Sequence, residues 1–207
     1  MPHLSYAGSA QRQRGLSLIV VLLILVVISI LGVGSAQIAL QGERSARNDR
    51  DMQLAWQAAE AALQDAEFDI HGPGTNNRSA FFGSLQDTSG FVTNCGTQGS
   101  GSSFNALGLC ALVMSGTPAW LNVDFTVTDT SARTVKFGTF TGRSFAASDS
   151  GTRGIEPYQA PRYVIEPIPD PGNRDLSSTA SYVYRVTAMG FGPRKDIQAV
   201  TQIIYRN

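Results

Sequence analysis

Hydrophobic and polar residues follow three different patterns along the chain, and each pattern predicts a different element. From Leu16 to Leu31 almost every residue is Leu, Ile or Val, and the first charged residue after Leu16 is Glu43. The 21 uncharged residues from Leu16 to Ala36 match the ~20 that a helix needs to cross the core of a bilayer. The first pattern therefore predicts a membrane-spanning helix.

Beyond this segment, apolar residues recur at steps of three and four, which is the spacing of one helix face. This face consists of Met52, Ala55, Ala59, Ala62, Ala66 and Ile70, and it is widened by Trp56 and Leu63. The opposite face carries Gln53, Gln57, Glu60, Gln64 and Glu67. The Gly72-Pro73-Gly74 sequence after His71 is a helix stop. We expect one helix from Leu16 to Ile70, roughly 80 Å long, with residues 16–36 in the membrane or among similar helices and residues 37–70 packed on the domain that follows.

Residues 71–207 read as a single β-rich head domain. Residues 72–118 are rich in Gly, Ser, Thr and Asn and predict loops, anchored by Phe81, Phe82, Leu85 and Phe91. Short β-rich runs follow, at Leu121–Val127, Thr134–Phe140, Arg162–Ile168, Tyr182–Ala188 and Ile197–Tyr205. The last two runs predict a hairpin, and the proline-punctuated residues 141–160 and 169–180 predict exposed loops. Strands grouped after one long helix favour an α+β fold, in which an antiparallel sheet packs against the helix.

The residues before the apolar segment allow two interpretations. Arg12, Arg14 and Gly15 precede Leu16, and no acidic residue occurs before them. In a secretory signal peptide, cleavage would follow the small residues 34–36. In a class III leader, residues 1–15 are removed between Gly15 and Leu16, and the apolar helix remains as the new N-terminus. The second interpretation is favoured because the first would cut the predicted helix in its middle.

A charged segment joins the apolar and amphipathic halves of the helix. Residues 43–51 hold six charges in nine positions. These residues are either a solvated helix surface just outside the membrane or a set of salt bridges to neighbouring subunits, made by Glu43, Arg44, Arg47 and Arg50. The sequence leaves both interpretations open.

The two cysteines, Cys95 and Cys110, both fall in the loop-rich part of the head. An even number of cysteines outside the membrane favours a disulfide over two free thiols. A structural zinc site is disfavoured, because the mature chain keeps only His71 as a histidine and no group of residues has metal-ligand spacing.

No catalytic or cofactor-binding motif occurs in the sequence. The glycine-rich residues 96–101 have no preceding strand and no following Lys-Ser or Lys-Thr, and the oxygen-bearing Asp170, Asn173 and Asp175 lack the rest of a calcium loop. Without Arg12 and Arg14 the chain has 14 basic and 16 acidic residues, so no positive surface for nucleic acid is expected. We therefore expect that the protein has no enzymatic activity and binds no cofactor, metal or nucleic acid.

Arg14-Gly15-Leu16-Ser17-Leu18-Ile19 resembles the prepilin peptidase site of type IV pilins. The residues Glu43-Arg44 and Asn48-Asp49-Arg50, LAWQAAEAALQDAE from Leu54, PRYVIEPI from Pro161 and YRVTAMGFG from Tyr184 are similar to those of PilX-type minor pilins. The resemblance implies cleavage after Gly15, N-methylation of Leu16, anchorage in the inner membrane with the head in the periplasm, and a role in priming pilus assembly near the tip. The implied partners are prepilin peptidase, the major pilin, other minor pilins and a large tip adhesin.

One position departs from the usual pilin pattern. Most pilins have Glu at the fifth mature position, where it pairs with the N-terminal amine of the next subunit, whereas this chain has Val20. A missing carboxylate indicates either a starting or capping position in a filament, which is favoured, or simple drift at this position. The alternatives to a minor pilin are a pseudopilin of a type II secretion system and a membrane-anchored binding or enzymatic domain.

Overall fold

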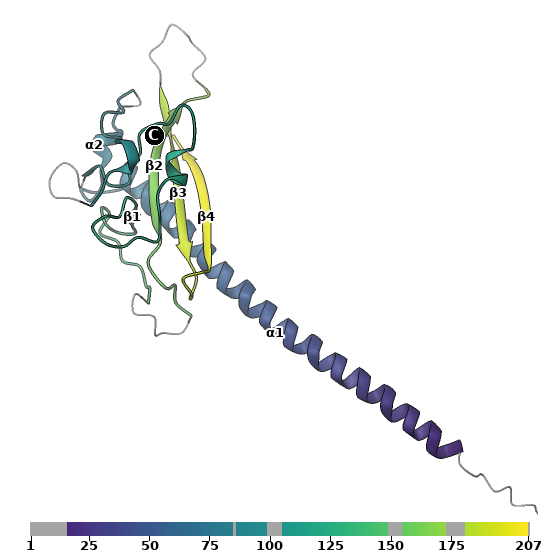
Figure 1. The fold of residues 1–207 in the computed structure, drawn as a ribbon. Coiled ribbons are helices and arrows are strands. Elements are labelled where there is room, and N and C mark those ends of the chain that lie inside the picture. Colours follow the sequence, from purple (N-terminus) through teal and green to yellow (C-terminus); the bar gives the residue numbers. More distant parts are fainter. Residues whose placement is uncertain (1–15, 85, 99–104, 149–154, 173–180, 207) are drawn as a thin grey trace, which may run out of the picture. The chain divides into compact units, whose positions relative to one another are not determined.

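The computed structural model of the protein describes residues 16–84, 86–98, 105–148, 155–172 and 181–206 (Figure 1). The chain divides into two compact units, residues 1–48 and 49–207, and α1 contributes to both. The elements in chain order are α1 (Leu16–His71), α2 (Ser79–Phe82), the 3-10 turns η1 (Thr93–Cys95) and η2 (Ala119–Leu121), and the strands β1 (Val135–Lys136), β2 (Arg162–Pro169), β3 (Tyr182–Phe191) and β4 (Gln198–Tyr205).

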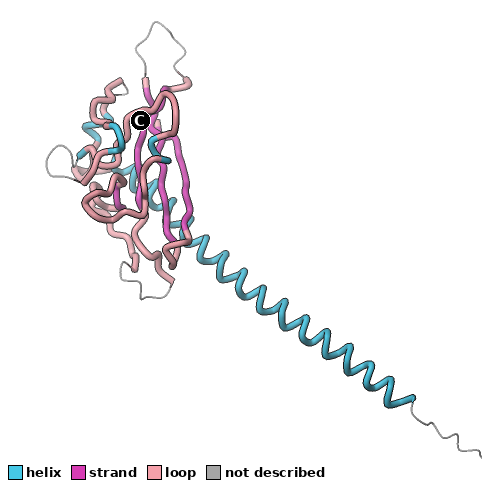
Figure 2. Tube along the Cα trace, in the orientation of Figure 1, coloured by secondary structure: helices cyan, strands magenta, loops and turns pink. Residues whose placement is uncertain are grey.

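The four strands form an antiparallel sheet in the order β1-β2-β3-β4 (Figure 2). In the register of β2 and β3, Tyr163 lies opposite Ala188 and Ile165 opposite Val186. In that of β3 and β4, Val186 lies opposite Ile203. The long N-terminal helix, the C-terminal antiparallel sheet and the hairpin of β3 and β4 confirm the predicted α+β fold.

The helix lies on one face of the sheet in the second unit. Ala62, Ala66 and Ile70 of α1 are fully buried in one core with Tyr163 and Tyr184 of the sheet. Because side chains alternate between the two faces of a strand, Val164 and Phe191 point the other way. These two side chains pack with Cys95 and Cys110 in a second core. Strands β2 and β3 are therefore covered on both faces, by α1 on one side and by a loop layer on the other.

Of the predicted strands, one is absent and another is shorter than predicted. Residues 121–127 form no strand: Leu121 is the last residue of η2, and Asp124 accepts hydrogen bonds from the backbone N–H (2.7 Å) and hydroxyl (2.7 Å) of Thr126. Such a local turn competes with strand pairing. The run predicted at 134–140 contributes only Val135–Lys136, because Gly138 adopts a positive φ of 79° and turns the chain.

Where the structure describes them, the predicted loops are confirmed apart from the short elements α2 and η1 within residues 72–118, but their exposure was only partly predicted. Phe82 and Phe91 are buried as expected and Phe81 packs against the same core, whereas Leu85 lies outside the described residues. Within residues 141–160, expected to be exposed, Ser148, Pro157, Gln159 and Ala160 are buried. Gln159 and Ala160 lead directly into the buried strand β2, and the N–H of Ser148 donates to the carbonyl of Pro157 (2.8 Å).

The helix face was predicted correctly except at its edge. Ala55, Ala59, Ala62, Ala66 and Ile70 are fully buried, and the five predicted polar positions are exposed. Met52 and Trp56 are 44% and 50% exposed, so they do not belong to the buried face. The indole N–H of Trp56 instead donates to Glu60 on the same helix (2.9 Å).

Candidate functional site

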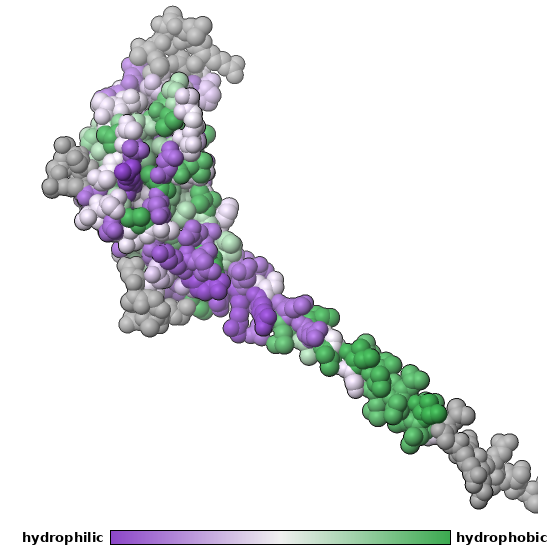
Figure 3. Space-filling view, in the orientation of Figure 1, coloured by the Kyte–Doolittle hydropathy of each residue, from purple (hydrophilic) through white to green (hydrophobic). Residues whose placement is uncertain are grey.

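The apolar half of α1 is the first candidate functional feature. This helix is the one in the described part of the chain that is long and apolar enough to cross a membrane, judged by length and composition. Figure 3 shows its apolar residues in green, followed along the helix by hydrophilic residues in purple. The hydroxyls of Ser29 and Ser35 donate to backbone carbonyls one turn earlier (2.7 and 2.8 Å), so neither exposes an unpaired donor to an apolar environment.

The predicted processing site lies at the start of this helix. Leu16 is the first residue of α1, and Gly15 lies outside the described residues, so cleavage between them stays a prediction. Val20 is 49% exposed on the apolar segment.

The charged segment that follows makes contacts within its own helix. Glu43 pairs with Arg47 one turn later, and both side chains are mostly exposed. The guanidinium of Arg50 pairs with Asp51 (2.8 Å), whereas Arg44 is exposed. Exposed pairs of this kind contribute about 0–1 kcal/mol. Salt bridges from this segment to neighbouring subunits stay a prediction.

A buried ion pair between Asp69 and Arg78 connects the C-terminal end of α1 to the rest of the head. The guanidinium of Arg78 donates to both carboxylate oxygens of Asp69 through Nε (2.9 and 3.1 Å) and again through Nη2. The hydroxyl of Tyr163 in β2 donates to the same carboxylate (2.9 Å). Asp69 is 0% and Arg78 4% exposed. Burial, together with the neighbouring Asp69 carboxylate, raises the pKa of Tyr163 well above its ordinary value.

Arg78 also reaches the loop layer. Its Nη1 donates to the carbonyls of Asn105 (2.8 Å) and Leu107 (2.7 Å), and its guanidinium lies 3.7 Å from the centre of the Phe140 ring. Both backbone carbonyls thus accept from Nη1 of this buried cation. Arg78 connects the helix to the loop that precedes Cys110, and Asp69 connects the same pair to Tyr163 of the sheet.

One helical turn earlier, Asp65 makes a second buried contact. Its carboxylate accepts hydrogen bonds from the backbone N–H of Gly138 (2.7 Å) and the hydroxyl of Thr141 (2.5 Å), and Arg143 lies 3.6 Å away. Burial raises the pKa of Asp65, although these hydrogen bonds oppose the rise. The effect of burial is the larger, so the pKa of this carboxyl lies above its ordinary value.

Sequence reasoning missed Asp65 and Asp69. Both lie three residues after a buried alanine of α1, at positions that belong to the apolar face. This spacing is the signal that could have revealed them, because a carboxylate on a buried face requires a partner. The partners themselves, Arg78, Thr141 and Tyr163, come from distant segments.

The pH dependence of stability should report the environment of Asp65. Because the folded protein holds this carboxyl at a raised pKa, its contribution to stability is fully present below the unfolded pKa, about 3.9 for Asp, and decreases as pH rises through the folded pKa. We expect wild type to lose stability relative to Asp65→Asn as pH increases from 4 upward. Denaturant titrations of both proteins across this range measure the difference, and a difference that is independent of pH would contradict the assignment.

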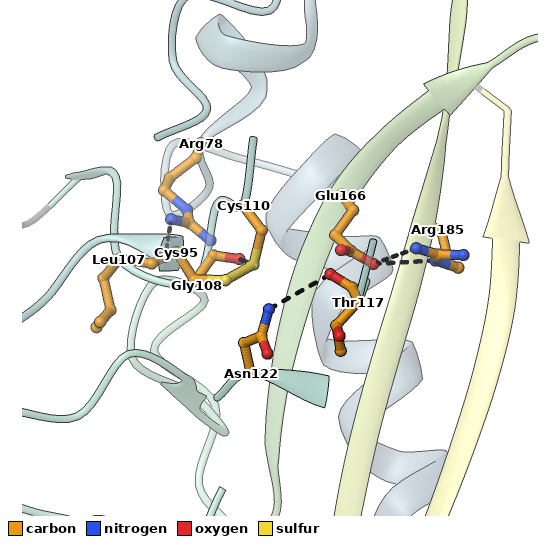
Figure 4. Close-up of a disulfide and its surroundings, with 9 residues drawn as sticks. All are labelled: Arg78, Cys95, Leu107, Gly108, Cys110, Thr117, Asn122, Glu166 and Arg185. Atoms are coloured by element: carbon orange, nitrogen blue, oxygen red, sulfur yellow. Dashed lines mark hydrogen bonds and ion pairs between the residues drawn. A yellow bond between two sulfur atoms is a disulfide. The ribbon is translucent and has the colours of Figure 1, made fainter. Parts of the chain in front are cut away.

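Cys95 and Cys110 form the predicted disulfide, 15 residues apart in sequence. Figure 4 shows it beside Gly108, with the Glu166–Arg185 pair of β2 and β3 on the same side of the sheet. Both cysteines are fully buried, and the segment around Cys110 is hydrogen-bonded to β2, where the N–H of Cys110 donates to the carbonyl of Ile165 (2.8 Å). The disulfide therefore closes the loop layer directly onto the sheet.

Removing the disulfide should destabilise the head. Closing a loop of this length contributes about 3 kcal/mol in the chain-entropy model, and we expect the double variant Cys95→Ala, Cys110→Ala to lose roughly this amount. The measurement is the free energy of unfolding of the full chain in detergent, with wild type in a reducing buffer as the matched comparison. Reduced wild type should unfold like the variant; if the variant and oxidised wild type unfold at the same denaturant concentration, the disulfide does not stabilise the head.

No group of three or more histidine, cysteine or carboxylate side chains is placed to hold a metal ion among residues that the structure describes. Asp170, Asn173 and Asp175 were considered above as calcium ligands. Asp170 pairs with Arg206 and accepts a hydrogen bond from the N–H of Gly172 (2.8 Å), whereas Asn173 and Asp175 lie outside the described residues. The glycine-rich residues 96–101 are described only as far as Gln98.

Two family models match the chain. The model for the PilX N-terminal region matches residues 14–64, which include the apolar and most of the amphipathic part of α1. The model for the C-terminal region of type IV pilus assembly protein PilX matches residues 106–207, which include all four strands and Cys110. No curated protein and no solved structure matches the chain significantly.

Proposed function

The chain belongs to the PilX family of type IV pilus assembly proteins, and from this premise we propose that it is a minor pilin that primes pilus assembly and lies at or near the pilus tip. The family is one of structural pilus components. We therefore assign a catalytic role to none of the residues of this chain.

The observation that carries the proposal is the apolar surface of α1 between Leu18 and Leu31. Its large side chains are exposed in the single chain, from Leu18 at 75% to Val27 at 46%. A surface of this kind must be covered by lipid or by other helices. Lipid covers this surface while the helix is in the membrane, and similar helices cover it after the helix leaves the membrane and joins a bundle.

Val20 supports a place at the start of the filament. A carboxylate buried without a partner in a dry helix bundle is destabilising. The first subunit of a filament has no earlier subunit to pair with, so a carboxylate at this position would destabilise it. Val20 avoids this destabilisation and also gives up the attraction that would draw the chain in below an existing subunit. This combination suits a subunit that is added first.

The proposal includes the steps before and after insertion. Prepilin peptidase cleaves after Gly15 and Leu16 is N-methylated. Before assembly the helix spans the inner membrane once, with the head in the periplasm. Afterwards the chain is in the extracellular pilus, in contact with the major pilin, other minor pilins and a large tip adhesin, and Glu43, Arg44, Arg47 and Arg50 make contacts between subunits.

A deletion strain tests the role in assembly. Loss of pili with intact type II secretion, restored by the wild-type gene, is the expected result, whereas intact pili with lost secretion would assign the chain to a secretion pseudopilin. Mass spectrometry of the membrane and pilus fractions should find a methylated chain that begins at Leu16. A chain that begins near Gln37 would contradict the proposal.

Placement at the tip is tested separately. Gold-labelled antibody against the head should mark one end of each pilus, and labels along the shaft would overturn tip placement. Val20→Glu should move some label into the shaft, with Val20→Gln as the matched control of similar size and no charge. A Val20→Glu protein that remains confined to the tip would show that the residue at this position does not determine placement.

A further inference from the structure

A cavity on the head contains a buried arginine that the assembly role does not use. The cavity has a volume of about 270 Å³ and is lined by Thr128, Lys136, Tyr158, Gln159, Ala160 and Arg162. It lies where β1 meets β2, in the second compact unit. Its volume is slightly below the ~300 Å³ at which sites for drug-sized molecules begin, so it suits a smaller ligand.

Arg162 is 4% exposed, and its hydrogen bonds do not neutralise its charge. Nε donates to the hydroxyl of Thr134 (2.6 Å) and Nη2 to the carbonyl of the same residue (2.7 Å). In the ion pairs found among the described ranges, Arg162 takes no part. Burial lowers the pKa of Arg162 to about 10, so the guanidinium is still a cation at neutral pH.

The strand register places a second cation beside it. Lys136 in β1 lies directly opposite Arg162 in β2. Like charges at directly opposed positions of a sheet are destabilising. Both residues line the same cavity, so two cationic groups border this space.

Gln159 supplies an independent indication. Its side chain is 7% exposed and lines the cavity, and its Nε2 amide is without a hydrogen-bond partner. A buried amide donor with no acceptor costs about 1–3 kcal/mol. A cation and an unsatisfied donor therefore face the same small space, and both require an acceptor that is negative or strongly polar.

We propose that this cavity binds a small molecule through an oxyanion, either a carboxylate or a phosphate group. The oxyanion accepts from the remaining N–H groups of Arg162 and from the amide of Gln159, and the hydroxyls of Thr128 and Tyr158 are available to further polar atoms of the ligand. The guanidinium fork matches the geometry of carboxylate and phosphate oxygens. This site does not depend on the role of the protein in the pilus.

The test uses the full chain in a non-ionic detergent and follows its thermal unfolding midpoint. Inorganic phosphate and sodium glucuronate are the two probes, because they present a phosphate and a carboxylate respectively. Sodium chloride at equal ionic strength controls for screening. We expect the midpoint to rise saturably with at least one probe, whose identity shows which group the site accepts, and to show no saturable rise with chloride.

Two variants connect the response to the cavity. Arg162→Gln should weaken the apparent affinity about 10- to 100-fold, as expected for hydrogen bonds to a charged group, whereas Arg133→Gln, which changes an exposed arginine outside this cavity, should respond like wild type. Gln159→Glu places a carboxylate next to Arg162. This variant should raise the midpoint without any probe and abolish the response to both.

The result for Gln159→Glu remains informative if Arg162→Gln fails to fold. The absence of a saturable rise in wild type would overturn the proposal. An unchanged response in Gln159→Glu would also overturn it, because the anion would then bind outside the cavity.

Discussion

Replacing Asp69 by alanine is expected to destabilise the head by about 3–5 kcal/mol, because the variant leaves the Arg78 charge buried without its partner. Arg78 is 4% exposed, so water does not replace the lost carboxylate. The hydroxyl of Tyr163 loses its acceptor at the same time. The loss is therefore larger than the removal of one hydrogen bond, which costs about 1 kcal/mol.

The measurement is a denaturant titration of the full chain in detergent, monitored by tryptophan fluorescence, to which Trp120, packed against the disulfide core, and Trp56 of α1 both contribute. Glu43→Gln is the matched control, because it removes a carboxylate from an exposed pair with Arg47 and should change stability by less than about 1 kcal/mol. A second variant, Asp69→Leu with Arg78→Met, removes both charges and should recover part of the loss. If Asp69→Ala is no less stable than Glu43→Gln, the buried pair does not have the energetic role assigned to it.

The second large effect is expected at Gly190 in β3. A methyl group added there would lie 2.0 Å from the carbonyl oxygen of Ala55 and 2.3 Å from the backbone nitrogen of Ala59. These atoms belong to the backbone of α1 and cannot rotate away, so the helix and the sheet must separate. We expect Gly190→Ala to cost about 3 kcal/mol or more, at or above the upper end of ordinary overpacking.

Gly83→Ala is the control for this prediction. Its added methyl would meet nothing closer than 3.7 Å, and its φ of −69° suits any residue. The same denaturant titration, followed by tryptophan fluorescence, measures the stability of both proteins. Accumulation of the chain in membranes provides a second readout. Equal stability of the two variants would show that α1 is not packed as closely on β3 as described.

The regular elements were predictable because local pattern determines them. The helix from Leu16 was predicted to end at Ile70 and ends at His71, and the strands at 162, 182 and 197 were each placed to within three residues of their observed bounds. Hydrophobic periodicity is strong in these segments, and tertiary contacts reinforce it. The disulfide followed from the number of cysteines and the compartment.

The rest depended on contacts between distant segments. Residues 121–127 have β-forming composition, but the side chain of Asp124 stabilises a turn, and Phe125 is buried under loops instead of in a strand. Asp65 and Asp69 occupy buried positions that only their partners from residues 78–163 make tolerable. The cavity at Arg162 arises from the pairing of β1 and β2, and no spacing in the sequence indicates that these residues share one space.

The two carboxylates near the end of α1 also bear on how the head would respond to force. A subunit anchored through α1 in a filament would experience tension along this helix. Asp65 and Asp69 hold it at two successive turns, the first to residues 138–143 and the second to Arg78 and Tyr163. Tension along the helix would therefore load both attachments at once, so each would share the force with the other.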